Sequence, residues 1–466
     1  MQRIFTIETL NYLNKTVKVA GWVHNRRDHG KVIFIDLRDK EGIIQIVFTP
    51  QIGEKFYNLA KQLRQEWVIE VIGELLERPE NLKNKNLETG NIEIQAKELK
   101  IFSEAKTPPF DLNSLGYEIS EEKRLKYRYL DLRRPRLKRN LQYRYEVINL
   151  MRKFLRERKF IEIETPILTK STPEGARDFV VPSRIFPGKF YALPQSPQQY
   201  KQLLQVAGFE RYFQIARCFR DEDQRGDRQL EFTQLDIEMS FVEQEDILNL
   251  IEELYIQIVK EIFPQKKIQK IPFPKITYKE AMEKYHSDKP DIRENKNNPD
   301  ELAFLFVIDF PMFEWKETEK RWEAVHHPFT RPQTENINEI KEHPDKILAF
   351  QYDFVLNGYE IGGGSLRIYK REMLEAIFEV LGHKKEEIEK QFGHLLEAFE
   401  YGVPPHGGIA PGIDRFLAVT LGEPNIREVI AFPKTGDSRD PMMNSPSEIE
   451  KEQLKELNLS IIQKRK

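Results

Sequence analysis

The sequence has a single cysteine, Cys218, among its 466 residues. One cysteine can form neither an intramolecular disulfide nor a cysteine-based zinc site, and a chain of this kind suits a reducing cytosol. The sequence has no run of about 18 apolar residues that would span a bilayer. Residues 1–5 also lack the basic-then-apolar pattern of a signal peptide. We therefore expect a cytoplasmic protein with no membrane segment.

A strong net charge is also absent, because 73 lysine and arginine residues face 75 aspartate and glutamate residues, for a formal charge of −2. A nucleic-acid partner would have to be held by local basic patches rather than by the field of the whole molecule. Hydrophobic residues make up 39% and charged residues 32% of the chain, which fits a folded globular protein. At this length, two or three domains are expected.

Residues 1–103 are predicted to form a β-barrel. The five segments with strand-like patterns span residues 17–23, 32–38, 42–48, 68–73 and 92–96. Residues 53–64 have a helical pattern and lie between the third and fourth of these segments. Five strands with one helix in that position match the order of an OB-fold barrel.

A second domain is predicted from residue 139 to residue 466, and we expect residues 104–138 to form a hinge. Pro108 and Pro109 stop regular structure at the start of this hinge, and the segment Lys123–Arg136 is very basic. Two interpretations of that segment stay open, a solvated helix face and a hinge that contacts phosphate. An amphipathic helix is predicted over 141–159. The later strands alternate, which favours an α+β domain with an antiparallel sheet flanked by helices.

The first segment that indicates chemistry is Arg217–Glu238, which is predicted to be a hairpin with a charged loop. Side chains that recur at every second position of its second strand share one face: they are Phe232, Gln234, Asp236 and Glu238. Polar groups that converge on a rigid sheet suit a binding site. Arg220 is suited to clamp an α-phosphate or a carboxylate, and Phe232 offers a flat face to a purine. The alternative is an exposed charged hairpin.

The second segment, Gly407–Val419, is a glycine-rich strand that runs into an apolar helix, with Arg415 near the start of the helix. Glycines let the backbone approach a ligand, and the start of a helix favours anions. The Gly-Lys-Ser/Thr ending of a P-loop is absent, and no parallel βαβ unit surrounds the segment. These absences exclude the two commonest glycine-rich nucleotide motifs.

The third segment places Asp353 and Glu360 on either side of a predicted Asn357–Gly358 hairpin turn. Two opposed carboxylates would repel unless a cation lies between them, and Mg²⁺ bridging ATP phosphates is the natural guest. Gly362–Gly364 are unusual inside a strand and predict close approach of a ligand to the backbone. Arg367 follows them and is suited to bind a carboxylate.

Together these segments resemble the motif 2 and motif 3 machinery of class II aminoacyl-tRNA synthetases. Phe160–Leu168, with Pro166 at its centre, resembles motif 1, whose role in that class is the dimer interface. Longer stretches narrow the resemblance to aspartyl-tRNA synthetases of the bacterial type: they are Thr172–Phe179, Gln195–Gln202 and His326–Thr330. The resemblance implies a homodimeric ligase that activates L-aspartate with ATP and transfers it to the 3′ end of tRNA(Asp).

The resemblance also assigns roles residue by residue. The catalytic residues would be Arg220, Glu222 and Arg415. ATP would be bound by Arg220, Asp221, Glu222, Gln229, Phe232, Glu360, Gly412, Ile413, Asp414 and Arg415. Aspartate would be bound by Glu174, Gln198, Lys201, Asp236, His326 and Arg367. Mg²⁺ would be held by Asp353 and Glu360, and the tRNA anticodon by Arg27, Phe34, Gln45 and Glu93.

Within that assignment, Arg367 and Lys201 would bind the side-chain carboxylate of aspartate, which an asparagine amide cannot replace. For Phe34, a place in the core of the barrel is the alternative to stacking on an anticodon base. Competing functions are an asparaginyl- or lysyl-tRNA synthetase, and a paralogue that acts as an amino-acid ligase or only binds RNA.

Two departures from the family pattern are visible in the sequence. Bacterial members usually carry an inserted domain where this chain has only the short connection 286–303. In addition, His29 and Gly30 occupy the first loop of the barrel, and a histidine there is often found in members that also charge tRNA(Asn). The second departure makes tRNA(Asn) a further expected partner.

Overall fold

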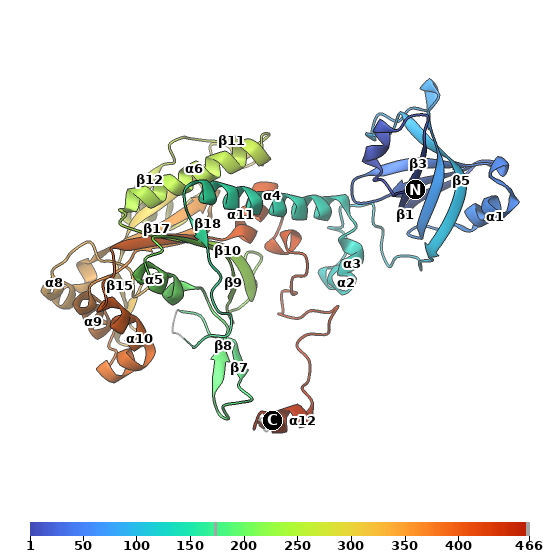
Figure 1. Ribbon diagram of the computed structural model, residues 1–466. Helices are drawn as coiled ribbons and strands as arrows, with labels where there is room; N and C mark the ends of the chain where they lie inside the picture. The colour runs from blue at the N-terminus through green and yellow to red at the C-terminus, as the bar shows by residue number, and fades with distance from the viewer. Residues whose placement is uncertain (172–174, 463–466) are drawn as a thin grey trace. The chain divides into compact units, whose positions relative to one another are not determined.

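The computed structural model describes residues 1–171 and 175–462. The chain divides into two compact units, Met1–Leu112 and Asn113–Lys466 (Figure 1). Residues 113–138, which the sequence assigns to a hinge, belong to the second unit. Within the described ranges, no helix is both long enough and apolar enough to cross a membrane.

The first unit is a closed five-stranded barrel in the order β1-β2-β3-β5-β4. Its elements are β1 (Thr16–Asp28), β2 (Ile33–Arg38), β3 (Ile43–Phe48), α1 (Glu54–Gln62), β4 (Val68–Glu77) and β5 (Ile92–Ser103). Every predicted strand is present, and the helix lies between the third and fourth strands as predicted. Apolar side chains alternate along β1 and β4 and fill the interior, as along β4, where Ile69, Val71 and Leu75 are fully buried. The OB-fold prediction is confirmed.

The second unit is built on an eight-stranded sheet in the order β12-β14-β17-β18-β19-β10-β9-β6. The strands in that order are Lys275–Thr277, Phe304–Pro311, Leu348–Leu356, Tyr359–Leu366, His406–Pro411, Glu231–Ser240, Arg211–Phe219 and Ile161–Glu162. The six central strands are antiparallel, as predicted, whereas the two edge strands β12 and β6 pair in parallel with their neighbours. The sheet is therefore mixed only at its edges.

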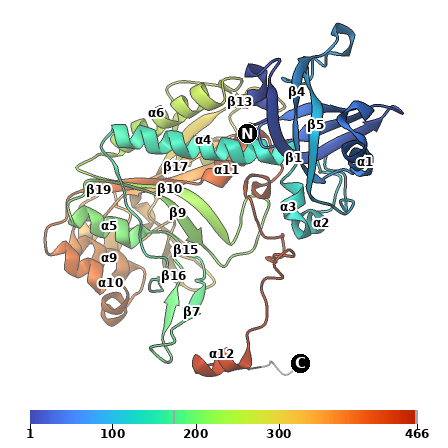
Figure 2. The same ribbon diagram turned by 45° about the vertical axis from the view of Figure 1, so that its right-hand side comes forward.

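Helices cover both faces of this sheet (Figures 1 and 2). The helices α4 (Pro135–Glu157) and α6 (Gln244–Ile262) lie on one side, and α5 (Gln198–Val206), α9 (Arg371–Val380) and α10 (Lys385–Phe399) lie on the other. The helix predicted over 141–159 starts earlier, at Pro135, because proline is well suited to the first helical position. The remaining helices are α2 (Glu121–Lys126), α3 (Arg128–Asp131), α7 (Tyr278–Tyr285), α8 (Ile337–Glu342), α11 (Ile413–Leu421) and α12 (Lys451–Glu456).

Three short two-stranded sheets complete the second unit. They are β7 (Val180–Pro182) with β8 (Phe190–Ala192), β11 (Lys267–Ile268) with β13 (Glu301–Leu302), and β15 (Phe313–Lys316) with β16 (Arg321–Ala324). The connection 286–303 contains only β13 and folds back on the main sheet, where Asn357 bonds to Glu301 and Ala303. A short linker therefore suffices to join α7 to β14.

Alternation along β10 separates the core from the polar face. Leu235, Ile237 and Met239 are buried in the hydrophobic core together with residues of α4, α6 and α11. Because successive side chains of a strand point to opposite faces, Gln234, Asp236 and Glu238 lie on the other face. The sheet therefore presents its functional groups on the side away from this core.

In the basic segment Lys123–Arg136, the burial of Arg124, Arg128 and Arg134 contradicts both interpretations for these three arginines, whereas Lys123 and Lys126 are exposed. The exposed fractions of Arg124, Arg128 and Arg134 are 6%, 2% and 0%. All three arginines pair with the buried carboxylate of Asp131. Arg124 also forms two hydrogen bonds with Glu428, 304 residues away. These arginines are neither a solvated face nor open to phosphate, because their charges are already neutralised inside the second unit.

Candidate active site

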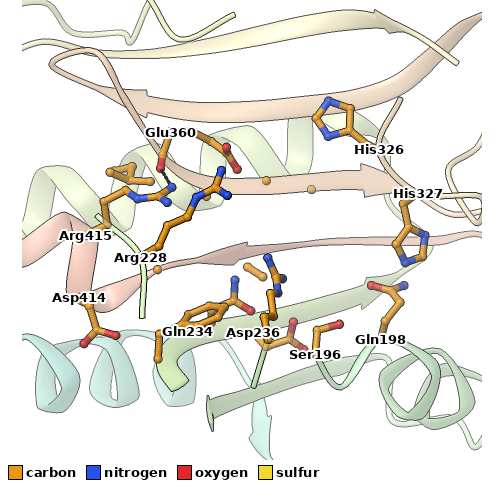
Figure 3. Close-up of a pocket in the computed structure, with 18 of the residues that line it drawn as sticks. Ser196, Gln198, Arg228, Gln234, Asp236, His326, His327, Glu360, Asp414 and Arg415 are labelled. Carbon is orange, nitrogen blue, oxygen red and sulfur yellow. Dashed lines mark hydrogen bonds between the residues drawn. The ribbon is translucent and has the colours of Figure 1, made fainter. Parts of the chain in front are cut away.

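A cavity of about 360 Å³ opens on the polar face of the sheet, between β10, β18, β19, the loop 220–229 and the start of α11 (Figure 3). Many of the predicted residues line it: Gln198, Lys201, Arg220, Glu222, Gln229, Phe232, Asp236, His326, Glu360, Arg367, Gly412, Asp414 and Arg415. Asp221, Asp353 and Ile413 do not line it. Glu174 lies outside the described residues.

One end of the cavity holds four buried charges on adjacent elements. Arg367 donates from Nε to Glu238 Oε1 at 3.0 Å and from Nη2 to Oε2 at 3.2 Å. Lys201 lies 2.8 Å from Asp236 and 3.2 Å from Glu238. Two cations and two carboxylates are thus balanced in a site of low solvent access, which is the condition under which buried charge is tolerated.

The cations in this cluster keep hydrogen-bonding capacity for a ligand. Arg367 has five N–H donors, of which two bond to Glu238 and one bonds to Ser365 Oγ at 2.6 Å. Lys201 has three donors and two carboxylate partners. Donors on both cations therefore remain at the cavity wall, where a carboxylate would be bound by both.

Glu238 was noted in the sequence only as part of the polar face, and the structure places it beneath these cations with no exposed surface. Its carboxylate fits because Gly408 on β19 has no side chain: a Cβ there would lie 2.2 Å from Glu238 Oε2. Arg367 and Lys201 hold the pKa of Glu238 below its usual value despite burial. Glu238 therefore stays ionised and fixes the direction of the Arg367 guanidinium.

His327 is a further residue at this end that the sequence reasoning did not assign. The backbone N–H of Phe329 donates to its Nδ1 at 3.2 Å, so the ring proton of the neutral form lies on Nε2. Nε2 is buried and has no hydrogen-bond partner among the described residues. Desolvation, and next the charges of Arg367 and Lys201, lower the pKa of His327 well below its usual value. A neutral N–H donor is thus available to a ligand oxygen.

The other end of the cavity holds cations with weaker attachments. The guanidinium of Arg220 lies 5.1 Å from the centre of the Phe232 ring, and its Nε has no hydrogen-bond partner in the described part of the chain. Arg415 donates to the backbone oxygen of Glu360 and lies 3.3 Å from Asp227. Arg228 is 44% exposed and lies 3.5 Å from Glu222. These groups are well placed to receive the phosphates of an anionic ligand. Figure 3 shows two of them, Arg228 and Arg415, on the same side of the cavity.

Two of the residues predicted to bind ATP have side chains that bond to other parts of the protein. Asp414 pairs with Arg144 on α4 and accepts from the backbone N–H of Thr233 at 2.8 Å. Gln229 forms hydrogen bonds with both the N–H and the oxygen of the Lys434 backbone, at 2.8 and 3.1 Å. Their side chains hold α11 and the loop 220–229 in place, so any contact of Asp414 with a nucleotide would come from its backbone.

The sequence suggested that the carboxylates Asp353 and Glu360 lie opposite each other across the hairpin. In the structure they are not paired directly. An irregularity after Phe354 shifts the register, so that Asp353 pairs with Gly363 and Glu360 pairs with Val355. The predicted Asn357–Gly358 turn is present, with φ of 50° and 85°. Both carboxylates nevertheless face one point, because a Cβ on Gly363 would lie 3.3 Å from Asp353 Oδ1 and 3.5 Å from Glu360 Oε1.

The surroundings of this pair disfavour ionisation of Asp353. Burial, and next the charge of Glu360, raise the pKa of Asp353 well above its usual value. Among the described residues, no group of three or more His, Cys, Asp or Glu side chains forms a metal site. Two carboxylates that face one point beside Gly363 match the small protein contribution that Mg²⁺ requires when phosphates supply its other ligands.

On the barrel, the four residues predicted to contact an anticodon form one connected patch. Arg27 donates to Gln45 Oε1 at 2.9 Å, and Gln45 donates to Glu93 at 2.8 Å. The Arg27 guanidinium lies 5.8 Å from the centre of the half-buried Phe34 ring, and His29 meets the same ring edge-on at 5.6 Å. Phe34 is therefore part of the outer face and not of the barrel core.

Several residues that line the cavity had no assigned role in the sequence reasoning: Ser196, Arg228, Gln234, His327 and Gln351. The sequence contained a signal for two of these residues. Gln234 lies in the every-second-residue pattern of β10, and His327 follows the assigned His326 directly. Gln351 is identified only through contact, since it donates to Asp353 Oδ1 at 3.0 Å.

A closed barrel joined in sequence to an antiparallel sheet with this charged cavity defines a class II tRNA synthetase. Residues 120–436 match the family described as tRNA synthetases class II (D, K and N), and residues 17–102 match the OB-fold nucleic acid binding domain. The chain therefore belongs to the class II tRNA synthetases of this group, and the predicted family is confirmed.

Individual relatives narrow the similarity further. An aspartate–tRNA(Asp/Asn) ligase of Syntrophomonas wolfei is 43% identical over 578 positions that cover 98% of each chain. One of Dehalococcoides mccartyi is 41% identical, covering 96% of each chain. Both alignments are longer than the 466 residues of this chain, so these relatives carry sequence that it lacks.

Among solved structures, the asparaginyl-tRNA synthetase from Pyrococcus horikoshii complexed with asparaginyl-adenylate is similar with a TM-score of 0.75 and 25% identity. The match covers 93% of this chain and 98% of that chain. An aspartyl-tRNA synthetase from Entamoeba histolytica, at 23% identity and a TM-score of 0.73, shares the fold.

Proposed function

We propose that this chain activates L-aspartate with ATP to form aspartyl-AMP and diphosphate, and then transfers aspartate to the 3′ end of tRNA(Asp) and tRNA(Asn). The observation that carries the choice of amino acid is the buried cluster of Arg367, Lys201, Asp236 and Glu238. The relatives named aspartate–tRNA(Asp/Asn) ligase support the choice of both tRNAs.

Aspartate is bound by charge and by hydrogen-bond count. Its side-chain carboxylate takes the remaining donors of Arg367 and Lys201, and its α-ammonium is received by Asp236 and by the amide oxygen of Gln198. An asparagine side chain would place an NH₂ group against two cations that are themselves only donors. The unpaired buried donors that result make asparagine a poor substrate.

ATP occupies the opposite end. Arg220 lies over Phe232, and we place the adenine against this ring with the α-phosphate at the guanidinium of Arg220. Arg415 and Arg228 receive the outer phosphates. Asp353 and Glu360 would hold Mg²⁺, which when bound supplies positive charge to the phosphate oxygens. The orphaned Nε atoms of Arg220 and Arg415 support a ligand in this position.

The reaction then requires placement rather than a nucleophile from the protein. The α-carboxylate of aspartate attacks the α-phosphorus in line, diphosphate leaves, and Arg220 neutralises charge on the α-phosphate in the transition state. The terminal ribose hydroxyl of the tRNA next attacks the carbonyl carbon of the mixed anhydride and AMP leaves. His327, neutral and with a donor N–H at the cavity wall, orients the aspartate end during both steps.

The barrel selects the tRNA. An aromatic ring on an open OB-fold face stacks well on an unpaired base, and Phe34 with the Arg27–Gln45–Glu93 chain offers stacking next to polar groups. His29 meets Phe34 edge-on and belongs to the same face of the barrel. We infer that this face accepts both anticodons.

We also propose that the enzyme is a cytoplasmic homodimer. The motif 1 stretch exposes Ile161, Ile167 and Leu168 at 48%, 48% and 54%, an apolar surface that a second copy would cover. The single cysteine fits a reducing compartment. Light scattering on the purified chain tests the assembly, and a monomer at micromolar concentration would contradict it.

Charging of purified tRNA(Asp) and tRNA(Asn) with labelled aspartate tests the function as a whole. We expect both tRNAs to accept aspartate. Charging of tRNA(Asp) alone would contradict the relaxed specificity while leaving aspartate activation intact. Formation of aspartyl-AMP with no charging of either tRNA would favour an amino-acid ligase paralogue.

A further inference from the structure

Behind the aspartate end of the cavity, three buried side chains form a chain of hydrogen bonds that ends at Gln198. His406 Nδ1 lies 2.8 Å from the backbone oxygen of Pro404, and His406 Nε2 lies 3.1 Å from Gln202 Nε2. Gln202 Oε1 in turn accepts from Gln198 Nε2 at 3.0 Å. The exposed fractions of His406, Gln202 and Gln198 are only 1%, 0% and 4%.

Each link in this chain has a defined direction. A carbonyl oxygen only accepts, so the proton of His406 must lie on Nδ1, facing Pro404. In neutral imidazole, Nε2 is then an acceptor, and it accepts a hydrogen bond from the NH₂ group of Gln202. The Gln202 oxygen is left to accept from the NH₂ group of Gln198. The carbonyl oxygen of Gln198 is thereby left for the cavity, where its side chain lies beside His327 (Figure 3).

The surroundings keep His406 neutral. Burial lowers its pKa, and the positive charges of Arg367 and Lys201 lower it further, while Glu238 and the Pro404 carbonyl act in the opposite direction. The ring also lies 6.5 Å from the Phe399 ring, which adds no hydrogen-bonding group. The tautomer that starts the chain is thus fixed by its position in the fold.

We propose that His406 and Gln202 are positioning residues that set the amide of Gln198 so that its oxygen, and not its NH₂ group, faces the substrate. An oxygen there accepts from the α-ammonium of the amino acid, whereas an NH₂ group would repel it. The inference rests on the proposed function, since it takes the α-ammonium of aspartate as the ligand of Gln198.

Replacement of Gln202 by leucine tests the chain. In Gln202→Leu, the Gln198 NH₂ group loses its acceptor and can turn to the cavity water; binding of the ammonium then leaves that NH₂ group buried and unpaired. We expect the KM for aspartate in ATP–pyrophosphate exchange to rise about tenfold. The KM for ATP and the inhibition constant of succinate, which lacks the amino group, should stay within about twofold, because neither ligand contacts the ammonium position.

Two further variants separate orientation from general damage. Gln202→Glu keeps an acceptor toward Gln198, and its second oxygen would accept from His406 Nε2 once that ring is protonated. Its aspartate KM should therefore stay within about threefold of wild type. Gln205→Leu removes another buried glutamine one turn along α5, which bonds to Ser240 at 2.6 Å and takes no part in the chain. It should lower stability without a selective effect on aspartate.

The inference is overturned if Gln202→Leu leaves the aspartate KM unchanged, if succinate weakens in parallel with aspartate, or if Gln202→Glu loses as much as Gln202→Leu. Should the Gln202 variants fail to fold, His406→Phe removes the first acceptor while keeping a ring, and the same selective rise in KM is expected. A wild-type chain without aspartate-dependent exchange would overturn the proposed function as well. Normal wild-type exchange without the selective effect would overturn this inference alone.

Discussion

The two ends of the cavity use similar side chains in opposite ways. At the amino-acid end, Arg367 is 5% exposed and paired with a Glu238 carboxylate that has no exposed surface. At the nucleotide end, Arg228 and Arg415 are 44% and 24% exposed, and Arg220 is attached mainly to the Phe232 ring. The first set is paired with buried carboxylates before a ligand binds, whereas the cations of the second set are more exposed, and their ion pairs are longer, at 3.3 and 3.5 Å.

This difference follows from what each end has to do. Discrimination between aspartate and asparagine requires donors that cannot rearrange, and buried ion pairs fix them at the cost of desolvation. Binding a triphosphate requires net positive charge and less exact geometry. We therefore expect substitutions at the amino-acid end to damage both folding and activity, and substitutions at the nucleotide end to damage activity alone.

The largest effect should come from Arg367→Leu. It removes the binding group for the substrate carboxylate and leaves Glu238 buried beside Lys201 alone, which should cost about 3–5 kcal/mol of unfolding free energy. Aspartate-dependent exchange should fall by more than about a thousandfold. Exchange kinetics and urea unfolding measure the two effects.

The matched control is Arg321→Leu, on an exposed hairpin where the arginine pairs with Glu319 and Glu323. Its stability should change by less than about 1 kcal/mol, with normal exchange. Unchanged exchange in Arg367→Leu would show that the side-chain assignment is wrong.

Arg220→Leu tests the nucleotide end of the cavity. Exchange should fall about 100-fold or more, because a charge on the α-phosphate loses its partner in the transition state. The free energy of unfolding should change by less than about 1 kcal/mol, since no buried carboxylate is left unpaired. A loss of stability as large as that of Arg367→Leu would break the distinction between the two ends.

Substitutions on the barrel face that carries Phe34 should lower activity without lowering stability, as at the nucleotide end. Phe34→Ala should lower kcat/KM for tRNA about 10- to 100-fold, the loss expected for one stacked base, with exchange and stability nearly unchanged. Phe102→Ala is the control, because Phe102 is 50% exposed on the same barrel with Lys100 over its ring. Equal losses from both variants would remove the specific role of Phe34.

The smallest effect concerns the buried carboxylate pair, and it depends on pH. The folded-state pKa of Asp353 is raised, so the native state holds a proton that the unfolded state releases as pH rises. Ionisation of Asp353 therefore opposes folding above pH of about 4, and stability falls until pH passes the raised pKa. Asp353→Asn removes this loss.

Urea unfolding without Mg²⁺ at pH 5 and pH 7.5 measures the difference. The variant should gain about 1 kcal/mol or more over wild type between these two values. Added Mg²⁺ and ATP should stabilise the wild type more than the variant. Identical pH dependence of the two proteins would contradict the assignment of charge repulsion to this pair.

Local patterns in the sequence predicted much of this molecule. Alternation predicted the five barrel strands, the hairpin of β9 and β10, and the polar face that carries Asp236. The Asn357–Gly358 turn was predicted because its positive φ angles favour these residues. The strand and loop patterns themselves indicated Arg220, Phe232 and Asp236. Other residues that line the cavity, among them Gln198, Lys201 and His326, were implied only by the family resemblance.

The remaining features depend on contacts between distant segments, which no local pattern carries. The sequence gives no sign that Arg124 and Arg136 pair with Glu428, which lies 304 and 292 residues away from them. In the sequence, Glu238 is one polar residue of β10 among several. Only the pairing of β10 with β19 places Gly408 opposite it. The register shift after Phe354 likewise depends on how β17 and β18 pair.

The most direct test of the central claim is ATP–pyrophosphate exchange by the wild-type chain with aspartate and with asparagine at matched concentrations. The donors of Arg367 and Lys201 predict rapid exchange with aspartate and at least about a thousandfold lower kcat/KM with asparagine. Exchange that is equally fast with asparagine, or absent with aspartate, would contradict the assignment of the buried charge cluster.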